Sequence, residues 1–220
     1  MKNFNIAIDG PAGAGKSTIA KAISKKLNFI YIDTGAMYRA VGLYYLNNNI
    51  DILKEDEVNS LLSNINITLT YENGVQQIIL NGENVSSLIR TEEVSHAASV
   101  VSTYKLVREK MVAMQKELAL VNNVVMDGRD IGTVVLPNAN VKVYLTATSE
   151  ERARRRHKEL IEKGIEITFL EVLEDIKVRD SRDMNRENSP LKQADDAVLI
   201  DSSNMSIDEV IEEILKLCNI

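Results

Sequence analysis

The feature that most constrains this 220-residue chain is a glycine-rich segment near its N-terminus, GPAGAGKS at residues 10–17. The segment matches the pattern G-x-x-x-x-G-K-[ST]. It follows an apolar run at residues 4–9 that predicts a strand, and it leads into residues 16–27, where apolar side chains recur at helical spacing. Strand, glycine loop and helix in this order predict a loop whose backbone N–H groups, at the positive end of the helix, surround a phosphate. The sequence therefore predicts a nucleoside triphosphate site.

The residues at the end of this loop have separate expected roles. Lys16 can reach the β- and γ-phosphates, the Ser17 hydroxyl can join a Mg²⁺ shell, and the Thr18 N–H can reach the α-phosphate. A glycine turn that only connects a strand to a helix would not explain Lys-Ser at this position. We therefore assign nucleotide contacts to Gly10, Pro11, Ala12, Gly13, Ala14, Gly15, Lys16, Ser17 and Thr18.

A second acidic element, VVMD, ends in Asp127. An apolar strand that ends in a carboxylate is common, so the segment alone carries little information. Beside a phosphate loop, the carboxylate is a candidate for the Mg²⁺ shell, either directly or through water.

Apolar runs alternate with helical patterns along most of the chain, which predicts a parallel sheet with helices on both faces. The expected strands are 4–9, 29–33, 124–127, 141–145 and a last buried strand at 197–200. The expected helices are 16–27, 36–46, 51–62 (begun at Asp51 or at residues 54–56), 91–101, 105–121, 149–163, 168–186 and 206–217, the last with a Ser206–Glu209 capping box. Runs at 65–71 and 75–80, with Asn-Gly turns, predict a small antiparallel insert.

The composition excludes several classes of protein. Lys and Arg number 26 against 32 Asp and Glu, a net charge of −6, which argues against a general nucleic-acid or anionic-membrane binder. A single Cys218 cannot form an internal disulfide, and with His96 and His157 it makes a poor metal site. No apolar run reaches membrane-spanning length, and a strand at the N-terminus leaves no room for a signal peptide. We expect a cytoplasmic protein.

Arginines cluster on two predicted helices of this acidic chain. Arg152, Arg155 and Arg156 share one helix face, and a second stripe is formed by Arg179, Arg182, Asp183 and Arg186. One interpretation is a solvated surface that pairs with nearby Glu and Asp. The other is a mobile lid whose guanidinium groups neutralise a transferring phosphoryl group and exclude water. Nucleic-acid binding is a poorer explanation, because the chain has no Trp and 5% aromatic residues.

Two further segments follow predicted strands and should lie at the ligand-facing edge of the sheet. They are DTGAMYR at residues 33–39 and GRDIGT at residues 128–133. Each carries an arginine, Arg39 or Arg129, that suits a second phosphate. Together they favour an acceptor site beside the phosphate loop.

With these segments the chain resembles the bacterial-type cytidylate kinases, members of the P-loop nucleoside monophosphate kinases. GPAGAGKST, DTGAMYR, IRTEEVSHAAS after the insert, LVREKM, DGRDIGTVV, SEERARRR and VRDSRDMNR occur in this order, and the resemblance spans residues 6–217. It implies transfer of the γ-phosphoryl group of ATP to CMP or dCMP, with Mg²⁺, in pyrimidine nucleotide metabolism. Ala12 and Thr34 stand where some members carry serine.

The resemblance also implies roles for residues at matching positions. Ser99, Arg108 and Asp130 would read the cytosine, and Thr34, Arg39 and Arg129 would hold the acceptor phosphate. Arg179 and Asp183 would bind the sugar. The groups expected to act on the transferring phosphoryl are Lys16, Arg129, Arg155 and Arg186.

The resemblance divides the chain into a core, an acceptor-binding lobe with the β insert, and a lid. The core comprises residues 1–35, 91–148 and 190–220, the lobe 36–90 and the lid 149–189, and we expect a monomer. Two alternatives stay open from the residues alone. One is a kinase of another small acceptor, such as UMP, a nucleoside or a shikimate-like acid, with Asp33 as the available base for a hydroxyl acceptor. The other is a nucleotide switch, although the chain lacks an Asn-Lys-x-Asp guanine reader.

Overall fold

A computed structural model describes residues 3–219 of the chain. The chain forms two compact units. The first contains residues up to 31 and from 121 onward, and the second contains residues 32–120. Each unit is described below by itself.

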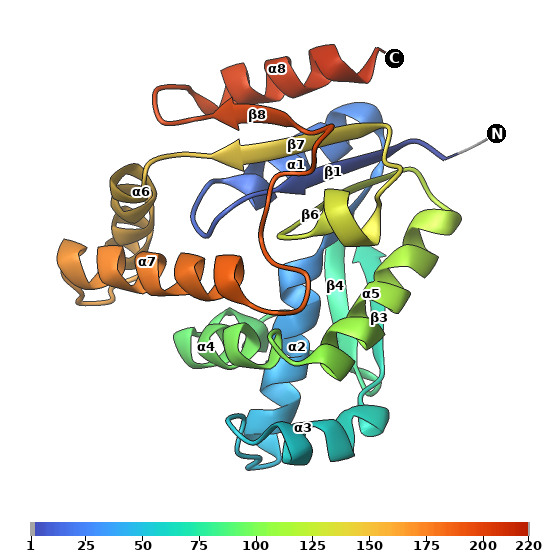
Figure 1. The fold of residues 1–220 in the computed structure, drawn as a ribbon, viewed down its shortest axis with the longest axis vertical. Helices are drawn as coiled ribbons and strands as arrows, with labels where there is room; N and C mark the ends of the chain where they lie inside the picture. The colour runs from blue at the N-terminus through green and yellow to red at the C-terminus, as the bar shows by residue number, and fades with distance from the viewer. Residues whose placement is uncertain (1–2, 220) are drawn as a thin grey trace. The chain divides into compact units, whose positions relative to one another are not determined.

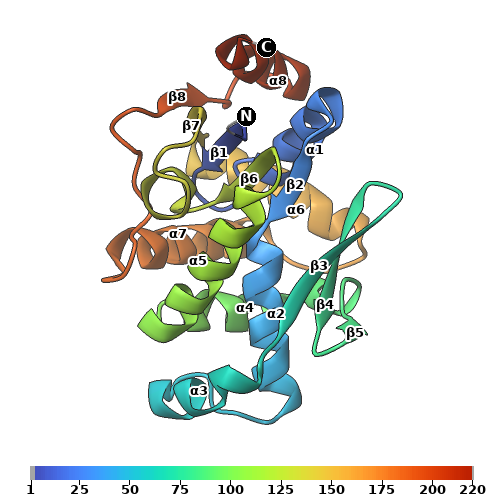
Figure 2. The same ribbon diagram turned by 90° about the vertical axis from the view of Figure 1, so that its right-hand side faces the viewer.

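The first unit is built on a five-stranded sheet with the strand order β2-β6-β1-β7-β8. Figure 1 labels β6, β1, β7 and β8, and Figure 2 labels β2. The strands are β1 (Asn5–Asp9), β2 (Ile30–Asp33, which runs across the unit boundary), β6 (Val124–Gly128), β7 (Val141–Thr146) and β8 (Val198–Asp201). Strand β1 pairs in parallel with β6 and β7, and β7 pairs in parallel with β8. The prediction of a parallel sheet is confirmed.

Helices α1 (Lys16–Leu27) and α8 (Ile207–Cys218) pack with this sheet. Their apolar side chains, among them Ile19, Ile23 and Ile214, share one buried cluster with Ile6 and Ile8 of β1. Helix α8 begins at the predicted capping box, in which the Ser206 hydroxyl and the Glu209 carboxylate satisfy each other's backbone N–H groups.

Helices α6 (Ser149–Glu162) and α7 (Phe169–Asn185) form a separate pair in the first unit. Ala153 and Leu160 of α6 pack against Val172 and Ile176 of α7 in a small apolar core. Thr168 caps α7 in a second capping box. The arginine-bearing helices are thus held together by a few buried apolar residues, and their polar side chains remain available for other contacts.

Strand β8 is the point where the predicted core is wrong. We expected a buried strand at residues 197–200, but Val198 and Leu199 are 44% and 55% exposed. The strand lies at the edge of the sheet, where Ile200 packs into the cluster with α8 (Figure 1). Apolar composition is the same for an edge strand and a central strand, so it could not distinguish them.

The second unit combines helices with the predicted antiparallel insert. Its helices are α2 (Thr34–Asn47), α3 (Glu55–Leu61), α4 (Glu92–Val101) and α5 (Lys105–Leu120), with short 3₁₀ turns at Leu62–Asn64 and Leu88–Arg90. Strands β3 (Ile67–Glu72), β4 (Val75–Leu80) and β5 (Glu83–Asn84) form a three-stranded antiparallel sheet, and β4 contacts α2 (Figure 2).

In the second unit, the tight turns and a helix start that we predicted from short sequence segments are confirmed. Asn73-Gly74 and Asn81-Gly82 both adopt positive φ angles, as predicted for tight turns. The helix expected over 51–62 begins at Glu55, the later of the two predicted starts, because Asp51 accepts the Leu53 N–H in a turn of its own. No helix among the described residues has the length and apolar content needed to cross a membrane.

Candidate nucleotide-binding site

The glycine loop connects β1 to α1, as the sequence predicted. A Cβ atom on Gly10 would lie 1.9 Å from the Leu145 carbonyl oxygen of β7, so only glycine allows the loop to leave the sheet at this point. The loop then enters α1 through Gly15 in the left-handed conformation, with Lys16 as the first helical residue. This geometry directs the N-terminus of α1 toward the loop, the arrangement that favours an anion.

Lys16 is buried at the base of this loop. Its Nζ donates to the Pro11 carbonyl at 2.7 Å. Burial, together with the charge of Arg129, lowers its pKa to about 7, although the charges of Asp127, Asp183 and Asp9 oppose the shift. The ammonium group is thus held inside the loop, in surroundings that disfavour its charge in the absence of an anion.

Ser17 and Asp127 lie together, as expected for two members of one metal shell. The Ser17 hydroxyl donates to Asp127 Oδ2 at 2.9 Å, and the Tyr31 hydroxyl donates to Asp127 Oδ1 at 2.8 Å. Hydroxyl and carboxylate oxygens are the ligands that Mg²⁺ takes beside water and phosphate, so these residues fit that ion. Within residues 3–219 no cluster of three or more His, Cys, Asp or Glu side chains could hold a metal ion.

The peptide of Ala12 in the loop is held by the two arginine-bearing helices. Arg152 Nη1 donates to the Ala12 carbonyl at 2.8 Å, and the Ala12 N–H donates to Asp180 Oδ1 at 3.1 Å. Arg152 and Asp180 form an ion pair of 2.6 Å, and both are buried. Arg152 therefore supports the loop and is not part of a solvated helix face.

Three more charged residues predicted for the site form a chain with Asp130 in the first unit. Arg129 Nε donates to Asp183 Oδ2 at 2.8 Å, and Arg186 lies 3.8 Å from Asp183 and 3.6 Å from Asp130. Burial would raise the pKa of Asp183, but the charges of Arg129, Arg186 and Arg179 hold it below its ordinary value. These four side chains, at positions 129, 130, 183 and 186, are thus brought together.

Other arginines of the two stripes make different contacts. Arg155, which the sequence suggested for the transferring phosphoryl, donates to the Ser202 carbonyl at 2.7 Å and to Glu151 at 3.1 Å. Arg156 pairs with Glu159, Arg154 with Glu151, and Arg179 with Asp175. Pairing within helices, the plainer of the two interpretations, accounts for the pairs with Glu151, Glu159 and Asp175. The Ser202 contact instead joins Arg155 to the residue that follows β8.

In the second unit, Asp33 organises the segment DTGAMYR. Its Oδ1 accepts the Ala36 N–H at 2.8 Å and caps α2, while its Oδ2 lies 3.3 Å from Arg39 and 3.6 Å from Arg90. The Asp33 N–H donates to Gln76 of β4 at 2.9 Å. Thr34 is buried as the first residue of α2. Arg39 and Thr34, both predicted for the acceptor phosphate, are therefore anchored around one carboxylate and its helix.

Arg108 and Ser99 belong to α5 and α4 of the same unit. Arg108 is buried, donates to the Ser102 carbonyl at 3.2 Å, and stacks 5.6 Å from the centre of the Tyr38 ring. The Ser99 carbonyl accepts the Ser102 hydroxyl at 3.0 Å. Ser102 and Tyr38 thus fix the end of Arg108, a rigid presentation that suits recognition of a planar base.

Sequence reasoning missed Tyr31, Asp180 and Gln76. Tyr31 carries no signal beyond its place in a strand, and Gln76 lies in an insert of ordinary composition. Asp180 lies in a segment rich in arginine, and nothing in the sequence marks it as a partner of the phosphate loop. Each forms a hydrogen bond with a residue far away in the sequence, and the shortest of these three separations is the 43 positions between Gln76 and Asp33.

A parallel sheet that carries this phosphate loop, with a hydroxyl and a carboxylate at its base, is typical of the P-loop nucleotide-binding proteins. Within that class, the profile of the family "Cytidylate kinase" matches residues 6–220, and the chain belongs to this family.

Relatives extend over the whole chain. It is 54% identical over 217 residues to the cytidylate kinase of Caldicellulosiruptor saccharolyticus (99% of this chain, 96% of the relative) and 52% identical over 216 residues to that of Shouchella clausii (98% and 96%). A crystal structure of an uncharacterized protein from Eubacterium ventriosum covers 99% of both chains with a TM-score of 0.54 at 12% identity, which bears on the fold alone.

Proposed function

We propose that this chain transfers the γ-phosphoryl group of ATP to CMP or dCMP, giving ADP and CDP or dCDP. The observation that carries the proposal is the 54% identity to a cytidylate kinase over 99% of the chain. The phosphate loop agrees with it, because the Lys16 ammonium lies within the loop and the Ser17 hydroxyl contacts the Asp127 carboxylate. The enzyme is a nucleoside monophosphate kinase.

The reaction requires no general base. The nucleophile is a phosphate oxygen of the monophosphate, which is ionised at neutral pH, so no hydroxyl proton has to be removed. Rate enhancement then depends on alignment of the two substrates and on neutralisation of the charge that spreads over the migrating group. Lys16 supplies a buried cation at the phosphate loop, and Arg129 and Arg186 supply guanidinium groups that carboxylates hold in place.

Mg²⁺ bound with ATP would be held by Ser17, with Asp127 directly or through water. When bound, it would supply positive charge to the β- and γ-phosphate oxygens. This chain contributes the Ser17 hydroxyl and Asp127 Oδ2, which contact each other. Tyr31 orients the Asp127 carboxylate by donating to its Oδ1.

Recognition of the acceptor is proposed for the following residues, each by its own chemistry. Asp130 accepts from the exocyclic amino group of cytosine, and Arg108 and Ser99 contact the ring edge. Uracil offers a carbonyl where cytosine has the amino group, so Asp130 disfavours it. Thr34, Arg39 and Arg129 take the acceptor phosphate, and Arg179 and Asp183 take the sugar hydroxyls.

The remaining assignments are also proposals. The lid comprises residues 149–189, the acceptor-binding lobe 36–90, and the core the rest of the chain. Arg155 acts on the phosphoryl group only if it leaves Ser202, which a moving lid allows. We propose that the enzyme works as a monomer in the cytoplasm.

An ADP-coupled assay with ATP and a panel of acceptors tests the function. CMP and dCMP should support ADP formation, while UMP, AMP, cytidine and shikimate should support little. Phosphorylation of cytidine in place of CMP would contradict the proposal, and ADP formation independent of any acceptor would indicate a nucleotide switch.

A further inference from the structure

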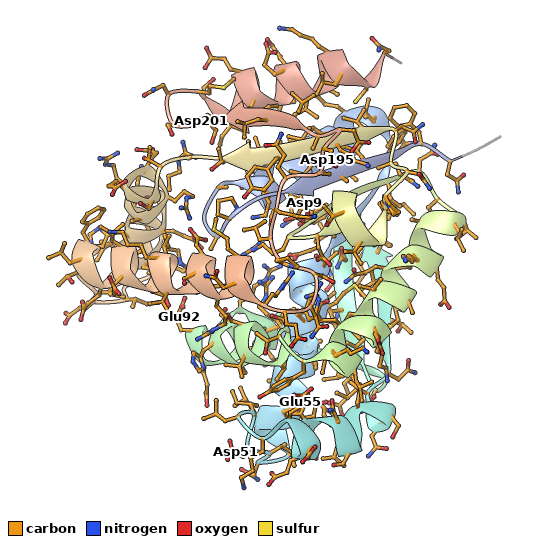
Figure 3. The ribbon with its side chains drawn as sticks, in the orientation of Figure 1. Asp9, Asp51, Glu55, Glu92, Asp195 and Asp201 are labelled. Atoms are coloured by element: carbon orange, nitrogen blue, oxygen red, sulfur yellow. The ribbon has the colours of Figure 1, made fainter. Side chains whose placement is uncertain are left out.

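Asp9 is a buried carboxylate that none of the roles above uses. It is the last residue of β1, directly before the phosphate loop, and is 5% exposed. Its Oδ1 accepts the Ile131 N–H at 2.8 Å and its Oδ2 accepts the Gly132 N–H at 2.7 Å. In Figure 3 Asp9 lies beside the short helical turn Ile131–Val135. Both carboxylate oxygens are thus directed at the segment that follows β6.

The two strands stop pairing at this point. Asp9 opposite Gly128 is the last residue pair of the β1–β6 ladder. After this pair the chain leaves the sheet at Arg129 and Asp130. The next backbone groups that form hydrogen bonds with a residue of β1 are the Ile131 and Gly132 N–H groups, which Asp9 accepts. The side chain of Asp9 therefore continues the connection after the ladder has ended.

Asp9 also accepts the N–H groups that a helix-capping side chain would ordinarily accept. The turn Ile131–Val135 begins after Asp130, whose side chain makes no capping hydrogen bond and lies 3.6 Å from Arg186. Because Asp9 satisfies the first N–H groups of the turn from another strand, Asp130 is released from the capping role that an Asp at this position ordinarily has. The local geometry thus leaves the Asp130 carboxylate for other partners.

Asp9 is closely packed by its neighbours, and its burial disfavours the negative charge of the carboxylate. A Cβ on Gly132 would lie 3.3 Å from Asp9 Oδ2 and 3.2 Å from the Lys142 side chain, so glycine permits the approach. Burial, with a smaller contribution from the charge of Asp130, raises the pKa of Asp9 to about 6, although the N–H groups of Gly132 and Ile131 and the charge of Lys16 oppose the shift. Burial disfavours the charged form of this carboxylate. The charged form nevertheless offers two acceptor oxygens, which the two N–H groups require.

We propose that Asp9 is a positioning residue for the acceptor nucleotide: by accepting the N–H groups of Ile131 and Gly132 it fixes Arg129 and Asp130 relative to the start of the phosphate loop. This inference rests on the proposed function, because Arg129 and Asp130 are the residues assigned to the phosphate and base of CMP. It makes recognition of the acceptor depend on a residue that touches neither substrate.

Asp9→Asn tests the proposal, since asparagine keeps the size of the side chain but can accept only one of the two N–H groups with its oxygen. The KM for CMP should rise about tenfold, because the segment that carries Arg129 and Asp130 loses one of the two charge-assisted hydrogen bonds that hold it, with a smaller change in the KM for ATP. Asp208→Asn, the same change at an exposed position in α8, serves as the control and should leave both constants unchanged. An equal rise in both KM values, or none, would overturn the positioning role.

A second measurement uses the wild-type protein without any substrate. In ¹⁵N-labelled protein, the amide signals of Ile131 and Gly132 should shift together between pH 8 and pH 5 with a midpoint near 6, and the shift should be absent in Asp9→Asn. Amides that do not titrate would overturn the proposed contact. Because this readout needs no catalysis, its failure is distinct from a wild-type enzyme that fails to phosphorylate CMP, which would contradict the proposed function instead.

Discussion

The two units organise their functional charges in different ways. In the first unit, cations and anions alternate along a chain from Arg129 through Asp183 and Arg186 to Asp130. In the second unit, one carboxylate, Asp33, meets both Arg39 and Arg90 and also caps α2. The first arrangement distributes its contacts over several partners, while the second depends on a single residue.

This difference has a physical consequence. In this alternating chain the two inner groups, Asp183 and Arg186, each have two partners, so they stay compensated when an end group is replaced. Around a single carboxylate, helix capping and arginine placement are lost together when that residue changes. We therefore expect substitutions in the second unit to combine effects on stability and acceptor binding, and substitutions at the phosphate loop to act chiefly on catalysis.

The largest effect is expected at Lys16. Lys16→Ala removes the buried cation of the loop and should lower kcat by about 10³-fold, the range seen when a preorganised charge-stabilising group is lost. Lys25→Ala, in the exposed last turn of α1, is the matched control and should retain wild-type kcat. Near-normal turnover in Lys16→Ala, with a thermal unfolding curve like that of wild type, would contradict the assigned mechanism.

A pair of substitutions at Asp33 separates its two tasks. Asp33→Ala removes the cap and both ion pairs and should lower the free energy of unfolding by about 2 kcal/mol. Asp33→Asn keeps a good cap, so its stability should stay within about 0.5 kcal/mol of wild type while the KM for CMP rises. Urea unfolding and steady-state kinetics give both quantities. Equal destabilisation by the two variants would mean that the cap is not the source of stability.

Protonation of Lys16 should be linked to ATP binding. With its pKa lowered to about 7, the free enzyme carries neutral Lys16 above that pH, whereas the triphosphate favours the charged form. ATP affinity should thus fall as pH rises above 7, by up to about tenfold per unit, and binding at pH 8 should take up a proton. Calorimetry in buffers of different ionisation enthalpy measures this uptake. It should vanish in Lys16→Arg, which stays charged, and its persistence there would assign the proton to another group.

The smallest effect is expected at Gln76, where the β insert supports Asp33. Gln76→Ala removes the acceptor for the Asp33 N–H and should raise the KM for CMP about threefold with little change in kcat. Gln77→Ala, on the neighbouring position of β4, is the control, because adjacent strand residues point to opposite faces. If both variants behave alike, the insert does not act through Asp33.

Much of the fold could be predicted because its signals are local. The phosphate loop, the bounds of α1, the Asn-Gly turns and the Ser206–Glu209 cap each depend on residues within a few positions of one another. The exposure of β8 could not be predicted, because a strand of apolar residues carries no information about whether a neighbour covers it.

The residues themselves determined that this chain binds a phosphate between a strand and a helix, since glycine, lysine and serine at fixed spacing serve that chemistry wherever the segment occurs. Tertiary structure decided which charges meet: Arg129 lies 54 positions from Asp183, and Lys142 lies 54 positions from Asp196. Arginines and carboxylates attract one another without regard to order along the chain, so only the packing of strands and helices selects the partners.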